Sequence, residues 1–229
     1  MLRIHDLQVA YGAKVVLDGL SLDLHPREIH GILGMNGAGK TTLFRTLYGW
    51  VKANRGGIDF GGKTLVRDDI AFLETDNTFL SFVTGREYLR LFTIRNEKFQ
   101  IDRWNEIFEL PLDQYVDGYS TGMRKKLAFL GMMAQNRSVM ILDEPFNGVD
   151  VESNEKICQI LTQLKERDRT LILSSHIIHS LTSICDRISF LNGGKIVRTY
   201  LREEFGVLEE EIKEWIKGDI DETVRELIG

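Results

Sequence analysis

The sequence predicts an α/β fold in which a parallel β-sheet core is covered by helices. Three observations predict it. Short apolar segments of strand length alternate with segments of helical spacing through the second half of the chain, and such alternation builds a parallel sheet. Glycine turns, rather than the three prolines, separate most of these segments. Near the middle of the chain lies a stretch with helical spacing only, which predicts an inserted helical subdomain.

The composition is that of a soluble globular protein and restricts the function. The 229 residues carry 29 − 34 = −5 formal charges, and this acidic balance argues against nucleic acid as the main partner. The longest apolar run, 127–134, is far shorter than the roughly 20 residues of a membrane span. Residues 1–6 lack the features of a signal peptide. Cys158 and Cys185 have no metal-site spacing, so we expect free thiols and a cytoplasmic chain.

The first third of the chain alternates strands with glycine turns around one helix. Leu2, Ile4, Leu7 and Val9 stand among polar neighbours, which is typical of a strand. The expected elements are strands 2–10, 15–24, 28–33 and 70–73, a helix 40–50, and a small hairpin bracketed by Gly56-Gly57 and Gly61-Gly62.

Helical spacing extends from about Thr84 to Asn136, and Tyr88, Leu91 and Phe92 fall on one face of it. The elements expected next are a strand 139–142, a helix 151–166, a strand 170–173, a short helix 177–184 and a hairpin 187–199. We therefore expect one domain over residues 1–200 with a helical subdomain at about 76–136. An acidic helical tail is expected over residues 201–229.

A glycine-rich turn joins the expected strand 28–33 to the expected helix. Its sequence, GMNGAGKT over residues 34–41, fits the pattern GxxxxGK[ST]. Glycines let backbone N–H groups approach a phosphate, and the helix N-terminus adds positive partial charge. Lys40 would neutralise β- and γ-phosphate oxygens, and the Thr41 hydroxyl suits Mg²⁺. The turn therefore predicts a nucleoside triphosphate site. The residues expected to contact ATP are Asn36, Gly37, Ala38, Gly39, Lys40, Thr41 and Thr42.

Two adjacent acids, Asp143 and Glu144, end a short apolar strand. In open α/β sheets ligands bind at the carboxyl ends of the strands, so we expect both carboxylates beside the phosphate loop. Asp143 would then hold Mg²⁺, and Glu144 would act as general base toward the attacking water. Alone, such a pair is a weak signal, because helix N-termini and loops also carry adjacent acids.

A third segment indicates the kind of phosphate-loop protein. Residues 119–127, YSTGMRKKL, resemble the signature sequence of ABC-transporter ATPase subunits, and the YSxGM form resembles the exporter-type branch with separate membrane subunits. Ser120 is also a suitable N-cap for a following helix. In that family the segment contacts the γ-phosphate held by the other protomer. The resemblance assigns that contact to Ser120, Thr121, Gly122 and Met123.

Other residues that match motifs of the family occur within residues 1–200, in the same order as in the family. Tyr11 matches the aromatic residue that stacks on adenine, and Asp150 matches the aspartate that couples the two sites across the dimer. His176 matches the switch histidine that contacts the γ-phosphate, and it follows an expected strand. The resemblance implies a RecA-like P-loop NTPase core with an N-terminal antiparallel β subdomain and an inserted α-helical subdomain.

The coupling loop, which begins with residues 74–76, departs from the family pattern. The family usually places Gln, or Glu in this branch, just after a strand such as 70–73, whereas this chain has Glu74 and then Thr75. Thr75 reaches less far toward Mg²⁺ than Gln does. Two explanations stay open. Either Glu74 or Asp76 makes the metal contact after a small backbone shift, or metal contact is weakened and the loop mainly serves docking to the membrane subunit.

The resemblance implies an ATP-hydrolysing subunit that energises transport, in the direction of export, through a separate integral-membrane permease. Two copies would sandwich two ATP molecules head to tail with Mg²⁺, on the inner face of the cell membrane. The alternative is a soluble ABC-type ATPase that acts on ribosomes, DNA or iron–sulfur assembly. A P-loop kinase or GTPase would lack the marks at Ser120 and His176. The transported substrate is not predicted, because in this family the membrane subunit selects it.

Overall fold

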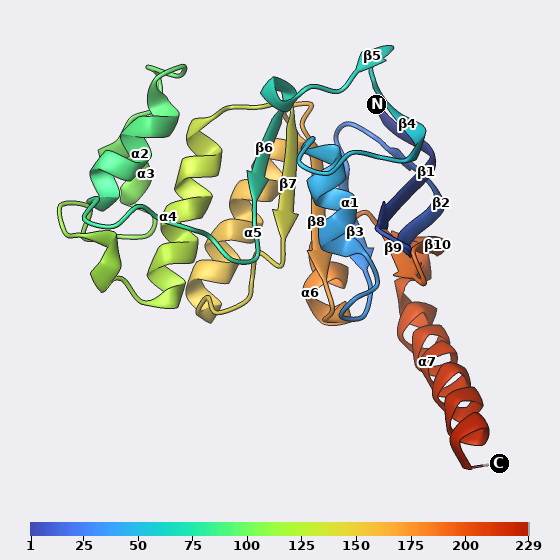
Figure 1. Cartoon of the computed structure of the whole chain (residues 1–229). Helices are drawn as coiled ribbons and strands as arrows, with labels where there is room; N and C mark the ends of the chain where they lie inside the picture. The colour runs from blue at the N-terminus through green and yellow to red at the C-terminus, as the bar shows by residue number, and fades with distance from the viewer. Residues whose placement is uncertain (229) are drawn as a thin grey trace.

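The computed structural model describes residues 1–228, and the side chains of residues 1–215 and 217. Its largest element is a six-stranded sheet with the order β10-β9-β3-β8-β7-β6 (Figure 1). All neighbouring strands are parallel except β10, which pairs antiparallel with β9 at one edge. The bounds are β3 Ile29–Leu33, β6 Ile70–Leu73, β7 Val139–Asp143, β8 Thr170–Ser175, β9 Arg187–Asn192 and β10 Lys195–Leu201. The predicted parallel sheet is thus confirmed.

Alternate residues of the central strands face two different cores. In β7, Met140 and Leu142 pack into a core shared with α4 and α5, whereas Val139 and Ile141 pack into a core shared with α1. Side chains alternate across a strand, so a strand that is apolar at nearly every position is buried on both faces. β3, β7 and β8 are buried at every residue, which places them at the centre of the domain. The helices around them are α1 Lys40–Leu47, α4 Thr121–Ala134, α5 Val151–Lys165 and α6 Ile178–Thr182.

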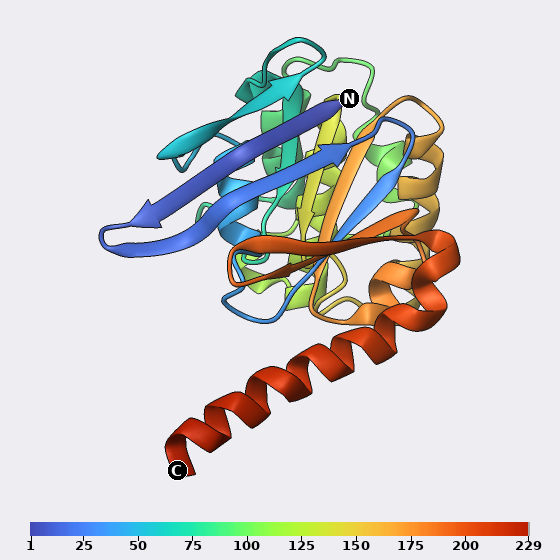
Figure 2. The same ribbon diagram turned by 90° about the vertical axis from the view of Figure 1, so that its right-hand side faces the viewer.

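A second, antiparallel sheet is built from the N-terminal part of the chain, in the order β2-β1-β4-β5 (Figure 2). Its bounds are β1 Leu2–Tyr11, β2 Lys14–Leu24, β4 Arg55–Phe60 and β5 Lys63–Thr64. The expected hairpin is displaced, because Gly56 and Gly57 lie inside β4 and only Gly61 and Gly62 form the turn. A Cβ at Gly56 would collide with the backbone of β1 at His5 and Asp6, so this glycine permits close strand contact.

Helix α1 is shorter than the expected 40–50 and ends at Leu47. Gly49 follows with a φ of +79°, a left-handed conformation that ends a helix. The chain then turns so that the Trp50 ring lies edge-on to Tyr48, with centroids 4.7 Å apart. The sequence predicted too long a helix because Tyr48 and Trp50 are apolar residues. They pack after the end of the helix rather than within it.

The inserted stretch contains less helix than expected. Its helices are α2 Gly85–Thr93, α3 Ile101–Asn105 and α4, joined by irregular segments and short 3₁₀ turns. Tyr88 and Phe92 of α2 pack against Gly131 of α4, where a Cβ would lie 3.0 to 3.1 Å from their rings. Leu91, expected on the same face, is 53% exposed. The contact stripe follows the four-residue spacing of Tyr88 and Phe92, and Leu91 lies beside it.

The acidic tail forms helix α7, Phe205–Ile228, which projects from the body of the domain (Figures 1 and 2). Leu208 and Ile212 near its start are buried in the main core. The expected tail also includes Gly229, which lies outside the described residues. Within residues 1–228, the structure contains no helix with the length and apolar character of a membrane span.

Candidate active site

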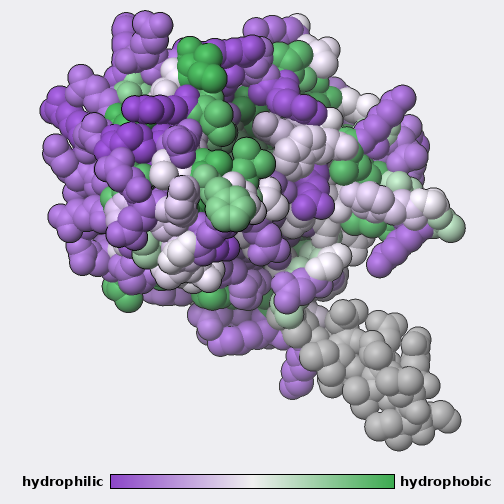
Figure 3. All heavy atoms as spheres, turned by 60° about the vertical axis from the view of Figure 1, so that its left-hand side comes forward, coloured by the Kyte–Doolittle hydropathy of each residue, from purple (hydrophilic) through white to green (hydrophobic). Residues whose placement is uncertain are grey.

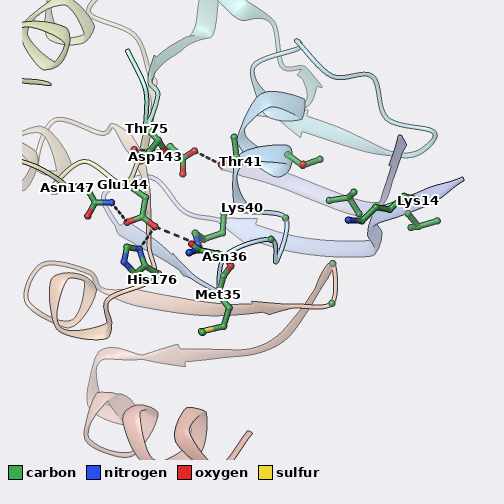
Figure 4. A pocket seen from close by; sticks show the side chains of 17 residues that line it. Lys14, Met35, Asn36, Lys40, Thr41, Thr75, Asp143, Glu144, Asn147 and His176 are labelled. Atoms are coloured by element: carbon green, nitrogen blue, oxygen red, sulfur yellow. Dashed lines mark hydrogen bonds and ion pairs between the residues drawn. The ribbon is translucent and has the colours of Figure 1, made fainter. Parts of the chain in front are cut away.

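The phosphate loop connects central strand β3 to α1 and curves around a cavity of about 690 Å³ (Figure 4). Gly37 and Gly39 adopt φ values of +84° and +111°, which side chains rarely allow. A Cβ at Gly39 would also lie 2.8 Å from Leu17 of β2. Position 39 therefore requires glycine, both for its positive φ and because a side chain there would clash with Leu17. The loop places the N-terminus of α1, with its free N–H groups, at the cavity wall.

Lys40 is the first residue of α1, and its side chain extends back across the loop. Its Nζ atom donates to the carbonyl oxygen of Gly34 at 2.6 Å and lies 3.6 Å from Oε1 of Glu144. The two charged side chains are only 8% and 9% exposed. A buried ammonium at the loop supplies concentrated positive charge to a phosphate that binds there.

Hydroxyl groups from two elements contact the Asp143 carboxylate at the end of β7. The Thr41 hydroxyl of α1 donates to Oδ2 of Asp143 at 2.8 Å, and the Ser174 hydroxyl of β8 donates to Oδ1 at 2.5 Å. Hydroxyl and carboxylate oxygens are the ligands that Mg²⁺ prefers, so Thr41 and Asp143 fit this ion. Among the described residues no group of three or more His, Cys, Asp or Glu could hold a metal. Thr41 and Asp143 would supply two ligands of a Mg²⁺ shell, which suits an ion shared with phosphates and water.

Glu144 is buried and directed into the cavity by an uncommon backbone conformation (Figure 4). Its φ of +50° lies in the left-handed region, which costs energy for a residue with a Cβ and often marks functional sites. Oε1 lies 2.9 Å from Nδ1 of His176, and Oε2 accepts from the Asn147 amide at 3.4 Å. The Glu144 N–H donates to the Ser174 hydroxyl at 3.0 Å. These contacts hold one carboxylate beside Lys40 and His176.

Comparison with known proteins gives a consistent result. A family model described as ABC transporter matches residues 17–147. MJ1023 of Methanocaldococcus jannaschii, an uncharacterized ABC transporter ATP-binding protein, is 32% identical over 200 residues, which cover 86% of this chain and 76% of that protein. The ABC transporter ATP-binding protein YtrB of Bacillus subtilis is 28% identical over 230 residues, covering 96% and 78%.

The chain belongs to the ABC transporter family. It is an ATP-binding ATPase of that family. Solved structures show the same fold. An ATP binding subunit of an ABC transporter matches with a TM-score of 0.85 at 24% identity, covering 93% of this chain and 98% of the other. The dimeric ATP-binding cassette MJ0796 bound to ADP and Pi matches with a TM-score of 0.80 at 20% identity, covering 88% and 99%.

The ABC ATPase fold brings together most of the residues expected at the nucleotide. Those that line the cavity are Asn36, Gly37, Gly39, Lys40, Thr41, Thr42, Thr75, Asp143, Glu144 and His176. Ala38 belongs to the loop, but its side chain is 8% exposed and does not line the cavity. Tyr11 is 51% exposed at the end of β1 and is not among the lining residues, so its stacking on adenine stays a prediction.

The signature residues lie at the N-terminus of α4, outside this cavity. Ser120 caps the helix, and its hydroxyl accepts from the Met123 N–H at 3.2 Å. A Cβ at Gly122 would lie 2.9 Å from the carbonyl oxygen of Gly148, so the signature packs closely on the loop after Glu144. Within one chain, the signature and the phosphate loop therefore contribute to different surfaces.

Asp150 sits in that loop and caps α5. Its carboxylate accepts from the Ser153 N–H at 2.9 Å and the Ser153 hydroxyl at 2.8 Å, and it lies 3.3 Å from Nζ of Lys126. These hydrogen bonds lower the pKa of Asp150 to about 2, so the cap stays charged. The cap links the signature helix to α5, and the expected role of Asp150 across a dimer stays a prediction.

The coupling loop directs Glu74 and Thr75 differently, and Asp76 does not line the cavity. Oε2 of Glu74 lies 3.3 Å from the Arg45 guanidinium of α1, and Glu74 does not line the cavity. Thr75 does line it, and its hydroxyl donates to the carbonyl oxygen of Asp143 at 3.5 Å. Of the two, Thr75 is therefore the residue placed beside the candidate Mg²⁺ ligands.

Several residues of the site were not predicted. Lys14, Val15, Val16, Met35, Gly193 and Gly194 also line the cavity. Gly194 is set by tertiary contact, because a Cβ there would collide with the carbonyl of Val16 on β2. The glycine pair 193–194 predicts a hairpin turn, but nothing in the sequence says that this turn meets the phosphate loop. Lys125 was also missed, because it stands between Arg124 and Lys126 in a basic run typical of an exposed face, whereas the structure buries it.

Proposed function

We propose that this chain is the ATPase subunit that energises transport through a separate integral-membrane subunit, and that it is held at the inner face of the cell membrane by that partner. The relatives include proteins named for import and for export, such as the ribose import protein RbsA of Bacillus subtilis and the teichoic acids export protein TagH of Lactococcus lactis. For this chain the YSTGM form of residues 119–123 supports export.

The chemistry follows from the cavity residues. Glu144 acts as general base, and His176 and Asn147 orient its carboxylate toward the attacking water. Lys40 contacts both the loop and Glu144, so a γ-phosphate that binds Lys40 competes with Glu144 for the ammonium and frees the carboxylate. Thr41 and Asp143 hold Mg²⁺, with Thr75 beside them. Bound Mg²⁺ supplies neutralisation of phosphate charge.

The site is completed by a second copy of the chain. The phosphate loop and Glu144 border one cavity, whereas Ser120 to Met123 lie elsewhere on the same molecule. The exposed N-terminus of α4, with the Ser120 hydroxyl and the backbone N–H of Gly122, suits a γ-phosphate held by another copy. Head-to-tail pairing places each signature over the other copy's phosphate loop, so neither site is complete until the two close.

An apolar surface near the coupling loop supports a membrane partner. Leu80, Phe82 and Tyr115 are 58% to 79% exposed, and Phe82 and Tyr115 form an edge-to-face pair with centroids 6.4 Å apart. On the side that carries the inserted helices, Figure 3 shows apolar side chains gathered near the middle of the face among hydrophilic ones. Exposed apolar patches of this kind mark interaction sites. We propose that this surface receives a loop of the membrane subunit.

A Glu144→Gln variant tests the catalytic proposal. Glu109→Gln, the same change at an exposed position, is the control. Glu144→Gln should bind ATP, hydrolyse it at least about 100-fold more slowly, and elute as a dimer with ATP and Mg²⁺. Glu109→Gln should behave like the wild type. A Glu144→Gln protein that remains monomeric at saturating ATP contradicts the two-copy site.

The membrane role needs a separate test. Phe82→Ser should leave ATP turnover unchanged and reduce recovery of the chain with membranes from cells that also express the permease. A wild-type chain absent from those membranes would instead favour the soluble ABC-type ATPase.

A further inference from the structure

A second cavity, of about 530 Å³, lies between α3, the C-terminal end of α4 and the C-terminal half of α5. It shares no residue with the ATP cavity. Its volume falls within the range of about 300–1,000 Å³ typical of small-molecule sites. The inserted helices form one wall and α5 forms the other. It is therefore a separate compartment at the junction of two parts of the domain.

The floor of this cavity is apolar and aromatic. The rings of Phe99 and Trp104 stack with centroids 5.3 Å apart and an angle of 11° between planes. Ile107 and Met133 continue the floor, and Ile160 of α5 faces them. Aromatic and aliphatic walls favour a ligand with an apolar body, because its surface leaves water on binding.

The rim carries more positive charge than nearby carboxylates balance. Lys98, Lys156, Arg167 and Arg169 line the cavity, and its described lining includes no Asp or Glu. Lys156 is neutralised by Glu152 at 2.6 Å. For the other three, no ion pair is found within the described part of the chain. An uncompensated cationic rim is unexpected on a protein with a net charge of −5.

Arg169 shows most clearly that the rim lacks a counter-charge. Its guanidinium is held by neutral acceptors, the side-chain oxygen of Asn136 at 2.5 Å and the carbonyl of Arg137 at 2.7 Å. Burial, and then repulsion from Arg167, lowers the pKa of Arg169. The neighbouring Asp168 pairs with Arg27 at 3.5 Å rather than with either arginine. A bound anion would relieve this repulsion.

We propose that this cavity binds a small amphiphilic anion, with an aliphatic or aromatic body against Trp104 and a carboxylate or phosphate at Arg167 and Arg169. A small ligand is favoured over a peptide helix, because the cavity volume of about 530 Å³ lies within the range of small-molecule sites. Such a ligand bridges the inserted helices and α5, the helix that Asp150 caps. The site therefore allows a small molecule to fix the inserted helices against the core without touching ATP.

The test uses Trp104 as the reporter. The chain has three tryptophans, so Trp50→Phe and Trp215→Phe leave Trp104 as the only one. In this background we expect decanoate, below its micelle concentration, to change the emission of Trp104 in a saturable way. Decyltrimethylammonium, with the same chain and opposite charge, and butanoate, with the same charge and a short chain, should each bind at least about tenfold more weakly.

Two variants test the location and the charge. Arg167→Glu should weaken decanoate binding at least about tenfold, whereas Arg103→Glu, on α3 but outside the cavity lining, should not. Ile160→Phe, which fills the cavity, should abolish saturable binding. Steady-state ATP turnover of Arg167→Glu should stay within about twofold of the wild type, because the ATP cavity is separate.

Absence of saturable decanoate binding overturns the proposal. Equal binding of decyltrimethylammonium, or equal effects of Arg167→Glu and Arg103→Glu, also overturns it. Binding of a synthetic acidic amphipathic helix of Leu and Glu, without binding of decanoate, assigns the cavity to a protein partner instead.

Discussion

Lys125 of α4 and Thr75 of the coupling loop are joined by a hydrogen bond of 3.0 Å from the ammonium Nζ to the Thr75 carbonyl oxygen. The same ammonium donates to the carbonyl oxygen of Glu74, also at 3.0 Å. Lys125 is 4% exposed, and burial lowers its pKa to about 8 despite the nearby carboxylates of Asp143 and Asp76. The helix that begins with the signature is thus tied to the loop beside Asp143.

Replacing Lys125 should affect turnover more than nucleotide binding. Lys125→Met leaves two carbonyl groups without their donor and loosens Thr75, while the phosphate loop keeps all its contacts. We expect kcat to fall about tenfold or more, with the KM for ATP changed by less than about threefold. Lys125→Gln retains a donor and should recover part of kcat. Equal losses in kcat and in ATP affinity, or a Gln variant as impaired as Met, contradict this positioning role.

Glu74 and Thr75 should differ in their effect on Mg²⁺ dependence. Because the Glu74 carboxylate contacts Arg45, Glu74→Ala should leave the Mg²⁺ concentration for half-maximal ATPase activity unchanged. Thr75→Ala removes the hydroxyl beside Asp143 and should raise that concentration about two- to tenfold. ATPase assays across a Mg²⁺ series measure both. If neither variant shifts the midpoint, neither of these two side chains contacts the metal.

Gly122 is expected to be intolerant of a methyl group. Gly122→Ala places a Cβ 2.9 Å from the Gly148 carbonyl oxygen and should separate the signature from the loop after Glu144. Gly118→Ala is the matched control, because a Cβ there meets nothing within 4 Å. Steady-state ATPase activity should fall at least about tenfold for Gly122→Ala and stay within about twofold for Gly118→Ala. Similar activities for the two variants would show that the close contact is unimportant.

His30 should make the fold sensitive to acid. It is 2% exposed in β3, its Nε2 lies 2.7 Å from the Ser189 hydroxyl, and burial lowers its pKa from 6.5 to about 3. The unfolded chain therefore binds a proton between about pH 6.5 and pH 3 that the folded chain does not, so stability falls as the pH falls through this range. From pH 7 to pH 5 we expect a loss of about 2 kcal/mol of unfolding free energy from this group.

Denaturant titrations at the two pH values measure the effect of His30. His30→Asn should show a smaller difference between pH 7 and pH 5, whereas His5→Asn, at an exposed position of β1, should retain the wild-type difference. An unchanged pH difference in His30→Asn rules out this histidine as the source.

The order of strands and helices could be predicted because it depends on local patterns. Each of β3, β7 and β8 contains a short apolar run bounded by polar residues or a glycine-rich turn, so each is recognisable without knowledge of its neighbours. Helix ends were less accurate, as at Leu47, where the end depends on Gly49 and on packing of Tyr48 and Trp50. The helix content of the stretch from Thr84 to Asn136 was overestimated, because helical apolar spacing also continues through loops that pack against the core.

The sequence alone determined the nucleotide chemistry. In residues 34–41 the glycines, Lys40 and Thr41 are neighbours along the chain, so local backbone geometry suffices to place them around a phosphate. Asp143 and Glu144 were predictable for a related reason, since parallel strands bring their carboxyl ends to one edge of a sheet.

Tertiary structure alone decided which way individual side chains face. Arg45, 29 residues from Glu74, draws its carboxylate out of the cavity and leaves Thr75 there. Lys125 reaches the same loop across 50 residues, and the turn at Gly194 meets Val16. These contacts join segments that are distant in sequence. They form only when the assembled sheet brings side chains of matching shape and charge together. Neither motif spacing nor periodicity carries that information, because both describe neighbours along the chain.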